Sequence, residues 1–126
     1  MKIRTTCLDH VVLNVSDVDA SRRWWSALTG AHATLDHEGE VSFVVGGQAI
    51  RLRAGTPAPR GSIGVCLIAD ASIDALYERA EQLHAVHGSV HPRTTATAPA
   101  QALTLEDPDG YQVELATYTP EGASVR

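Results

Sequence analysis

Four side chains with reactive groups lie in short apolar stretches of the sequence: His10, Arg51, Cys66 and Glu114. An imidazole and a carboxylate can transfer protons or bind a divalent metal, and a guanidinium can hold an anion. A thiol reacts as a nucleophile when a base or a positive charge lowers its pKa, and Arg51 is a conceivable partner for Cys66. Because cysteine is also a small residue that is commonly buried, we favour a core or wall position for Cys66.

Three closely spaced histidines form a second set of candidate metal ligands: His84, His87 and His91. His84 and His87 can share one face of a helix, but Gly88 is expected to end that helix. No nearby carboxylate or cysteine completes a metal-binding set. We therefore interpret these histidines as a solvated helix end.

The first half of the chain is predicted to contain one helix and four strands. The helix is capped by Ser16 or Asp17 and ends at Gly30. Its apolar stripe indicates burial against a sheet and consists of Trp24, Trp25 and Leu28. The strands are expected at residues 11–15, 33–35, 41–45 and 49–52.

The second half repeats this order of elements. Residues 55–61 are rich in proline and glycine and are interpreted as a linker. A helix is expected after them at residues 73–84. The strands are expected at residues 65–68, 88–91, 102–105 and 111–115.

Short motifs repeat as well as elements. Residues 10–13 resemble residues 64–67, and residues 47–52 resemble residues 110–115. Internal duplication of this kind indicates an architecture built from one repeated unit. The sequence therefore predicts a single α+β domain of two tandem βαβββ modules, the first at about residues 5–54 and the second at about residues 62–118.

The composition favours a small-molecule ligand. The net charge of −5 and the lack of a lysine-arginine run argue against nucleic acid as a partner. The apolar run near the start of the sequence is too short for a signal peptide or a membrane span. Cys7 and Cys66 do not have the spacing of a zinc site or a disulfide framework. We therefore expect a cytoplasmic protein with reduced thiols and no membrane partner.

Two longer motifs resemble a known family. Residues 8–15 and residues 106–115 are similar to the opening and closing signatures of the vicinal oxygen chelate superfamily, which includes glyoxalases, bleomycin resistance proteins and extradiol dioxygenases. Residues 59–62, 66–68 and 92–94 resemble the branch of glyoxalase domain-containing protein 5 and virulence proteins. The resemblance covers nearly the whole chain. It implies a cupped, mixed, mostly antiparallel sheet with two outer helices, and a homodimer.

The resemblance also implies positions for a divalent metal on the first and last strands of each module. His10 and Glu114 lie at two of these four positions, which makes them candidate metal ligands and candidate catalytic residues. By the internal repeat, Gly64 matches His10 and Arg51 matches Glu114. Glycine and arginine do not bind a metal, and Arg51 would repel a cation.

Three interpretations of His10 and Glu114 stay open. In the first they hold a divalent metal (zinc, nickel, manganese or iron), and water or substrate completes its coordination. In the second the pocket is metal-free, Arg51 binds an anionic or polar ligand, and His10 and Glu114 act as acid, base or hydrogen-bond partners. In the third Glu114 and Arg51 form an ordinary buried ion pair, and a neighbour satisfies His10. The candidate substrate-binding residues are Arg51, Asn14, Cys66 and Tyr111.

For function, we expect a small-molecule-binding protein with a degenerate metal site, either a metal-independent enzyme or a sequestering protein of the bleomycin-resistance kind. One alternative is a metal-dependent lyase, isomerase or dioxygenase that resembles glyoxalase and uses His10 and Glu114. A further alternative is a structural or interaction domain, which predicts a filled cup without an accessible cavity.

Overall fold

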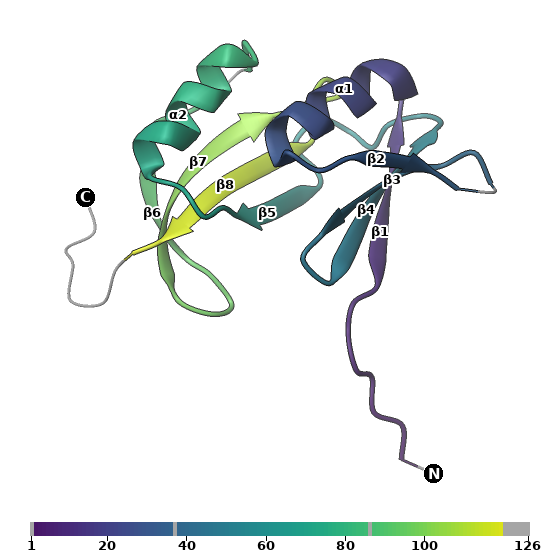
Figure 1. The fold of residues 1–126 in the computed structure, drawn as a ribbon, viewed down its shortest axis with the longest axis horizontal. Coiled ribbons are helices and arrows are strands. Elements are labelled where there is room, and N and C mark those ends of the chain that lie inside the picture. Colours follow the sequence, from purple (N-terminus) through teal and green to yellow (C-terminus); the bar gives the residue numbers. More distant parts are fainter. Residues whose placement is uncertain (1, 37, 86, 120–126) are drawn as a thin grey trace. The chain divides into compact units, whose positions relative to one another are not determined.

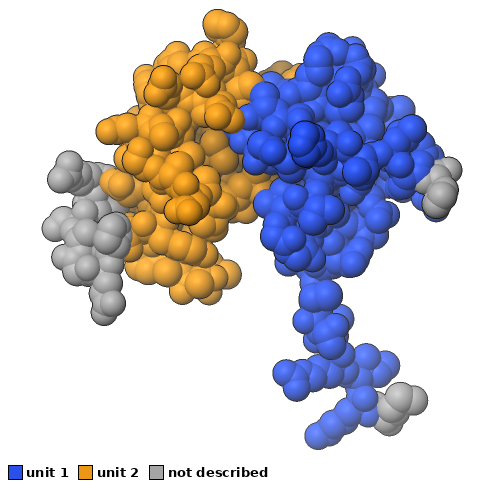
Figure 2. All heavy atoms as spheres, in the orientation of Figure 1, with its two compact units in different colours: residues 1–57 blue, residues 58–126 orange. Residues whose placement is uncertain are grey.

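The computed structural model describes residues 2–36, 38–85 and 87–119, and the chain divides into two compact units. Unit 1 is Met1–Pro57 and unit 2 is Ala58–Arg126, drawn in blue and orange in Figure 2. Unit 1 contains β1 (His10–Val15), α1 (Val18–Thr29), β2 (Ala33–Leu35), β3 (Val41–Val45) and β4 (Gln48–Ala54). Unit 2 contains β5 (Gly64–Ile68), α2 (Ile73–Gln82), β6 (His91–Thr94), β7 (Pro99–Glu106) and β8 (Gln112–Tyr118).

Both units have the same topology (Figure 1). Sheet order in unit 1 is β1-β4-β3-β2, and in unit 2 it is β5-β8-β7-β6. The first and last strands of each unit pair in parallel, and the other pairs are antiparallel. The parallel pair is possible because a helix and two further strands connect its members. The predicted α+β fold of two βαβββ modules is therefore confirmed.

The first helix begins and ends where local sequence predicts. The Asp17 side chain accepts a hydrogen bond from the backbone N–H of Ala20 at 3.0 Å, which satisfies one free donor of the first turn. Gly30 follows the helix in the left-handed conformation (φ 71°), which glycine adopts without strain. Trp25 and Leu28 are buried, and Trp24 is half-buried with its ring edge against Trp25.

The second helix is shorter than predicted. It begins after the Ser72 cap but ends at Gln82, and His84 takes a left-handed conformation (φ 52°) that breaks the helix before Gly88. The strand expected at residues 88–91 is wrong in its bounds. His87 forms an isolated bridge with Leu105, and β6 begins only at His91.

In each unit the helix covers one face of the sheet (Figure 1). Alternate strand residues point to this face and are buried. In unit 1 they include Leu13, Phe43, Ile50 and Leu52, and in unit 2 they include Leu103, Leu105, Val113 and Leu115. The residues between them point to the other face, which we call the helix-free face. Neither helix in the described part of the chain is long and apolar enough to cross a membrane.

Candidate functional site

Strand register makes corresponding positions of the two units directly comparable. In unit 1 His10 lies opposite Ala49, and in unit 2 Gly64 lies opposite Gln112. Two residues further along, Arg51 lies opposite Val12, and Glu114 lies opposite Cys66. The register thus agrees with the equivalence of His10 with Gly64, and of Arg51 with Glu114, in the sequence repeat. All of these positions lie on the helix-free faces, because they alternate with the buried residues.

His10 is held between a carboxylate and a guanidinium. Its Nδ1 lies 2.8 Å from Oδ2 of Asp9, and its Nε2 lies 3.5 Å from Nη1 of Arg51. An ionised carboxylate only accepts and a guanidinium only donates, so these partners favour the ring with its proton on Nδ1 and a lone pair on Nε2. The hydrogen bond from His10 lowers the pKa of the Asp9 carboxyl, which keeps this acceptor ionised.

Arg51 has charge available for a ligand. Its side chain is half-buried, and its Nε is buried without a hydrogen-bond partner. Among the described residues of unit 1, no carboxylate lies within ion-pair distance of this guanidinium. A guanidinium in this state is suited to a carboxylate or phosphate group, which it can hold through two parallel hydrogen bonds.

Glu114 in unit 2 has an ion-pair partner that the sequence analysis did not identify. Its side chain is 19% exposed, and its Oε2 lies 3.1 Å from Nε of Arg93 and 3.9 Å from Nε2 of His91. The Arg93 contact is an ion pair but not a hydrogen bond, because its angles do not suit one and Oε2 has no hydrogen-bond partner. Alternation along β6, which puts His91 and Arg93 opposite Ala102 and Ala100, is the signal that would have found both residues. The expected pairing of Glu114 with Arg51 would need residues of both units and stays a prediction.

Cys66 is exposed and lies opposite Glu114 in the β5–β8 pair. Burial raises the pKa of its thiol, the charge of Glu114 raises it further, and Arg93 only partly offsets them. A raised pKa disfavours the nucleophilic thiolate. This environment favours the wall position for Cys66 over a reactive one.

Two further candidate residues lie in different environments. Asn14 is exposed on β1 and lies beside Gly55, where an added Cβ would come within 3.3 Å of its Cγ. Tyr111 is buried, with 1% of its surface exposed, and its hydroxyl accepts a hydrogen bond from the backbone N–H of Ala58 at 3.1 Å. The structure therefore gives Tyr111 a packing role in unit 2, and its contact with a ligand stays a prediction.

The donor set in each unit does not fit a divalent metal. Within residues 2–36, 38–85 and 87–119, no three His, Cys, Asp or Glu side chains come close enough together to hold one. Nε2 of His10, the nitrogen left free for a metal, faces the positive charge of Arg51. The negative charge of Glu114 is already compensated by Arg93.

Comparison with known proteins identifies relatives over nearly the whole chain. Residues 7–115 match the family model of the Glyoxalase/Bleomycin resistance protein/Dioxygenase superfamily. The virulence protein STM3117 of Salmonella typhimurium is 30% identical over 122 residues, which cover 88% of this chain and 83% of that protein. Its crystal structure aligns with a TM-score of 0.80 over 93% of this chain and 100% of that one, at 26% identity.

Two further solved structures share the fold. A protein from the mobile metagenome of V. pseudocholerae aligns with a TM-score of 0.82 at 25% identity, over 94% of this chain and 99% of that one. The fosfomycin resistance protein FosX of Listeria monocytogenes, solved with Mn(II) and sulfate, aligns with a TM-score of 0.71 over 95% and 94% of the two chains. Its identity of 17% makes this a likeness of fold alone. The resemblance inferred from the sequence motifs is confirmed.

Proposed function

Because the chain belongs to the Glyoxalase/Bleomycin resistance protein/Dioxygenase superfamily, we propose that it binds a small organic anion through Arg51, without a resident metal at His10 and Glu114. One observation carries the proposal: the Arg51 guanidinium lies 3.5 Å from Nε2 of His10 and has no carboxylate partner among the described residues of unit 1. A fixed positive charge at this place attracts an anion and repels a cation.

His10 supplies the chemistry that this proposal allows. A ligand whose anionic group is held by Arg51 compensates the guanidinium charge, so that the Nε2 lone pair can then accept a proton or a hydrogen bond from this ligand. Asp9, 2.8 Å from Nδ1, then stabilises the imidazolium that forms. With a reactive ligand this arrangement is that of a metal-independent enzyme, and with an unreactive one it is that of a sequestering protein.

Metal content and anion binding together test the proposal. Untagged protein is analysed by inductively coupled plasma mass spectrometry beside a Glu114→Ala variant. Nicotinate binding is then followed by NMR through the Arg51 Nε–H and the His10 ring signals in wild type, Arg51→Gln and Arg23→Gln. Arg23 is the matched control, because it is an exposed arginine of α1 that pairs with Asp19.

The expected result is a metal-free protein that binds nicotinate, with binding lost in Arg51→Gln and kept in Arg23→Gln. About one zinc, nickel, manganese or iron per chain that disappears in Glu114→Ala would contradict the proposal. It would support instead the glyoxalase-like metal enzyme that uses His10 and Glu114. A protein that binds neither metal nor anion would support the structural or interaction domain.

We also propose that the chain works as a homodimer in the cytoplasm. The dimer is supported by the family resemblance of the sequence motifs. The cytoplasm is supported by the two cysteines, which are free and exposed, as is compatible with a reducing compartment. Size-exclusion chromatography with light scattering at micromolar concentration tests the dimer, and a monomer mass would contradict it.

A further inference from the structure

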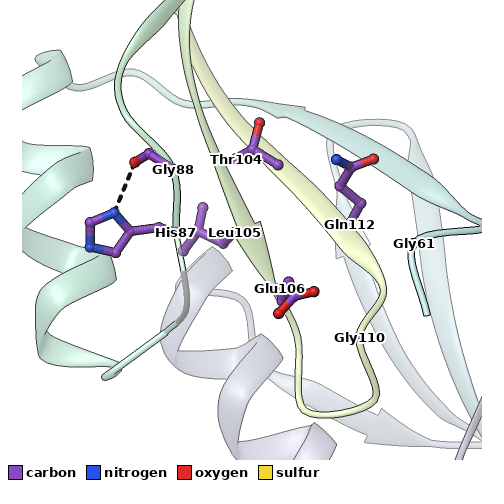
Figure 3. A pocket seen from close by; sticks show the side chains of 8 residues that line it. All are labelled: Gly61, His87, Gly88, Thr104, Leu105, Glu106, Gly110 and Gln112. Atoms are coloured by element: carbon purple, nitrogen blue, oxygen red, sulfur yellow. Dashed lines mark hydrogen bonds between the residues drawn. The ribbon is translucent and has the colours of Figure 1, made fainter.

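Unit 2 carries a hollow of its own, separate in its chemistry from the His10–Arg51 pair. It has a volume of about 300 Å³, which is in the range of small-molecule sites. It lies along β7 and β8, and three of its lining residues are glycines, so that backbone forms much of its surface (Figure 3). The lining residues are Gly61, His87, Gly88, Thr104, Leu105, Glu106, Gly110 and Gln112.

One end of the hollow carries a charge that is already paired. Glu106 accepts a hydrogen bond from Nη1 of Arg60 at 3.0 Å. The Arg60 side chain lies flat on Gly110, where an added Cβ would come within 2.7 Å of its Cγ. The arginine is therefore fixed beside the carboxylate, and this end offers a ligand little net charge.

At the other end the His87 ring is also fully engaged. Its Nδ1 lies 3.0 Å from the carbonyl oxygen of Gly88, the contact drawn in Figure 3, and its Nε2 lies 3.1 Å from Oε1 of Glu81. Both partners are acceptors, so neither ring nitrogen is free for a ligand. A charge on this ring is compensated by Glu81.

Two neutral polar side chains of the hollow have unused hydrogen-bonding capacity. Thr104 lies opposite Glu114 and Gln112 lies opposite Glu106 in the β7–β8 pair, so both project from the helix-free face (Figure 3). Within the described part of the chain, neither the Thr104 hydroxyl nor the Gln112 carboxamide has a hydrogen-bond partner. Together they present two donor groups, the hydroxyl and the NH₂, and two acceptor oxygens.

Gly64 keeps the Gln112 carboxamide accessible. A Cβ added at Gly64 would lie 4.0 Å from Oε1 of Gln112, so any longer side chain at this position would cover the amide. Unit 1 has the opposite arrangement, with the large side chain of His10 facing the small Ala49. The larger side chain of the pair is therefore His10 on the edge strand β1 in unit 1, and Gln112 on the inner strand β8 in unit 2. In unit 2 this larger side chain is a neutral amide.

We propose that this hollow binds a neutral carboxamide or lactam group of a small molecule, with Gln112 as the pairing residue and Thr104 as a second hydrogen-bond partner. A primary amide is self-complementary, because its N–H donates to the carbonyl oxygen of a second amide and its own oxygen accepts in return. Paired charges at both ends leave no attraction for an ion. The inference deepens the proposed function by adding a ligand group, but it depends on different residues in the other unit.

Nicotinamide and nicotinate are a matched pair of probes, since they share a ring and differ only in amide against carboxylate. Binding is measured by NMR at millimolar concentration, through the Gln112 side-chain NH₂ and the Thr104 methyl signals. The variants are Gln112→Glu, which keeps the shape but loses the N–H donors, and Gln112→Leu. Gln82→Leu is the control, because Gln82 is an exposed residue at the end of α2, on the covered side of the sheet.

We expect nicotinamide, but not nicotinate, to shift the Gln112 and Thr104 signals. Its Kd should rise roughly tenfold in Gln112→Leu, which loses both hydrogen bonds of the amide pair, rise less in Gln112→Glu, which loses one of them, and stay unchanged in Gln82→Leu. The inference is overturned if nicotinamide leaves these signals unmoved, or if its Kd is the same in Gln112→Leu. Either outcome leaves the proposed function standing, provided that nicotinate still shifts the Arg51 and His10 signals.

Discussion

Nε2 of His10 and Nη1 of Arg51 lie 3.5 Å apart on the parallel strands β1 and β4 of unit 1. At the position of Arg51, unit 2 carries Glu114. The equivalent strands β4 and β8 therefore carry opposite charges at this position. The following predictions test what this and other contacts contribute.

Replacing Arg51 by glutamate should create a metal site in unit 1. The change removes the cation beside His10 and puts a carboxylate in its place, so that imidazole and carboxylate are available together. We expect zinc or manganese to bind at least about tenfold more tightly than to wild type, measured by isothermal titration calorimetry. Arg51→Gln, which removes the charge without adding a ligand, should show a much smaller gain. Equal gains in both variants would mean that repulsion alone matters.

Replacing Asp9 by asparagine should change the tautomer of His10. The carboxylate holds the proton on Nδ1, and an asparagine amide can either accept from Nδ1 or donate to it. ¹⁵N chemical shifts of the two ring nitrogens should show a lower fraction of the Nδ1–H form. A tautomer ratio unaffected by Asp9→Asn would contradict the geometry.

His87 should make the stability of the protein depend on pH. The Gly88 carbonyl raises the pKa of this ring above its ordinary value of 6.5, and Glu81 adds to the effect against the opposing effect of burial. Since the folded-state pKa is raised, the stabilisation is fully present below about 6.5 and is lost as the pH rises through the raised pKa. Urea unfolding across this range should give a falling free energy in wild type and a flatter profile in His87→Gln. His32→Gln, at an exposed position, is the control and should keep the wild-type slope.

Gly110→Ala should destabilise the protein by about 1–3 kcal/mol. Gly110 has a φ of 85°, where an L side chain is strained, and the new Cβ would also meet Cγ of Arg60 at 2.7 Å. Gly47→Ala is the matched control, since nothing lies within 4 Å of its added Cβ and its φ is outside the left-handed region. Thermal unfolding of both variants measures the difference. A Gly110→Ala variant as stable as Gly47→Ala would show that Arg60 and the turn adjust without cost.

Much of the fold follows from local sequence. The cap at Asp17, the stop at Gly30 and the alternation of the strands depend on neighbouring residues, so the repeated βαβββ order was predictable. The end of α2 was not. His84 takes a left-handed conformation that its residue type does not demand, since the chain must turn back to lay His87 beside Leu105.

The sequence by itself determined the family and the two modules. It also determined that Gly64 and Arg51, which do not bind a metal, occupy two of the four expected ligand positions. All of this depends only on the order and the types of the residues. Only the tertiary structure decided which charges meet. Strand register and alternation bring Arg93 to Glu114, leave Arg51 beside His10, and leave Gln112 exposed opposite Gly64. Side chains far apart in sequence become neighbours through strand pairing, and their partners can be identified only once that pairing is known.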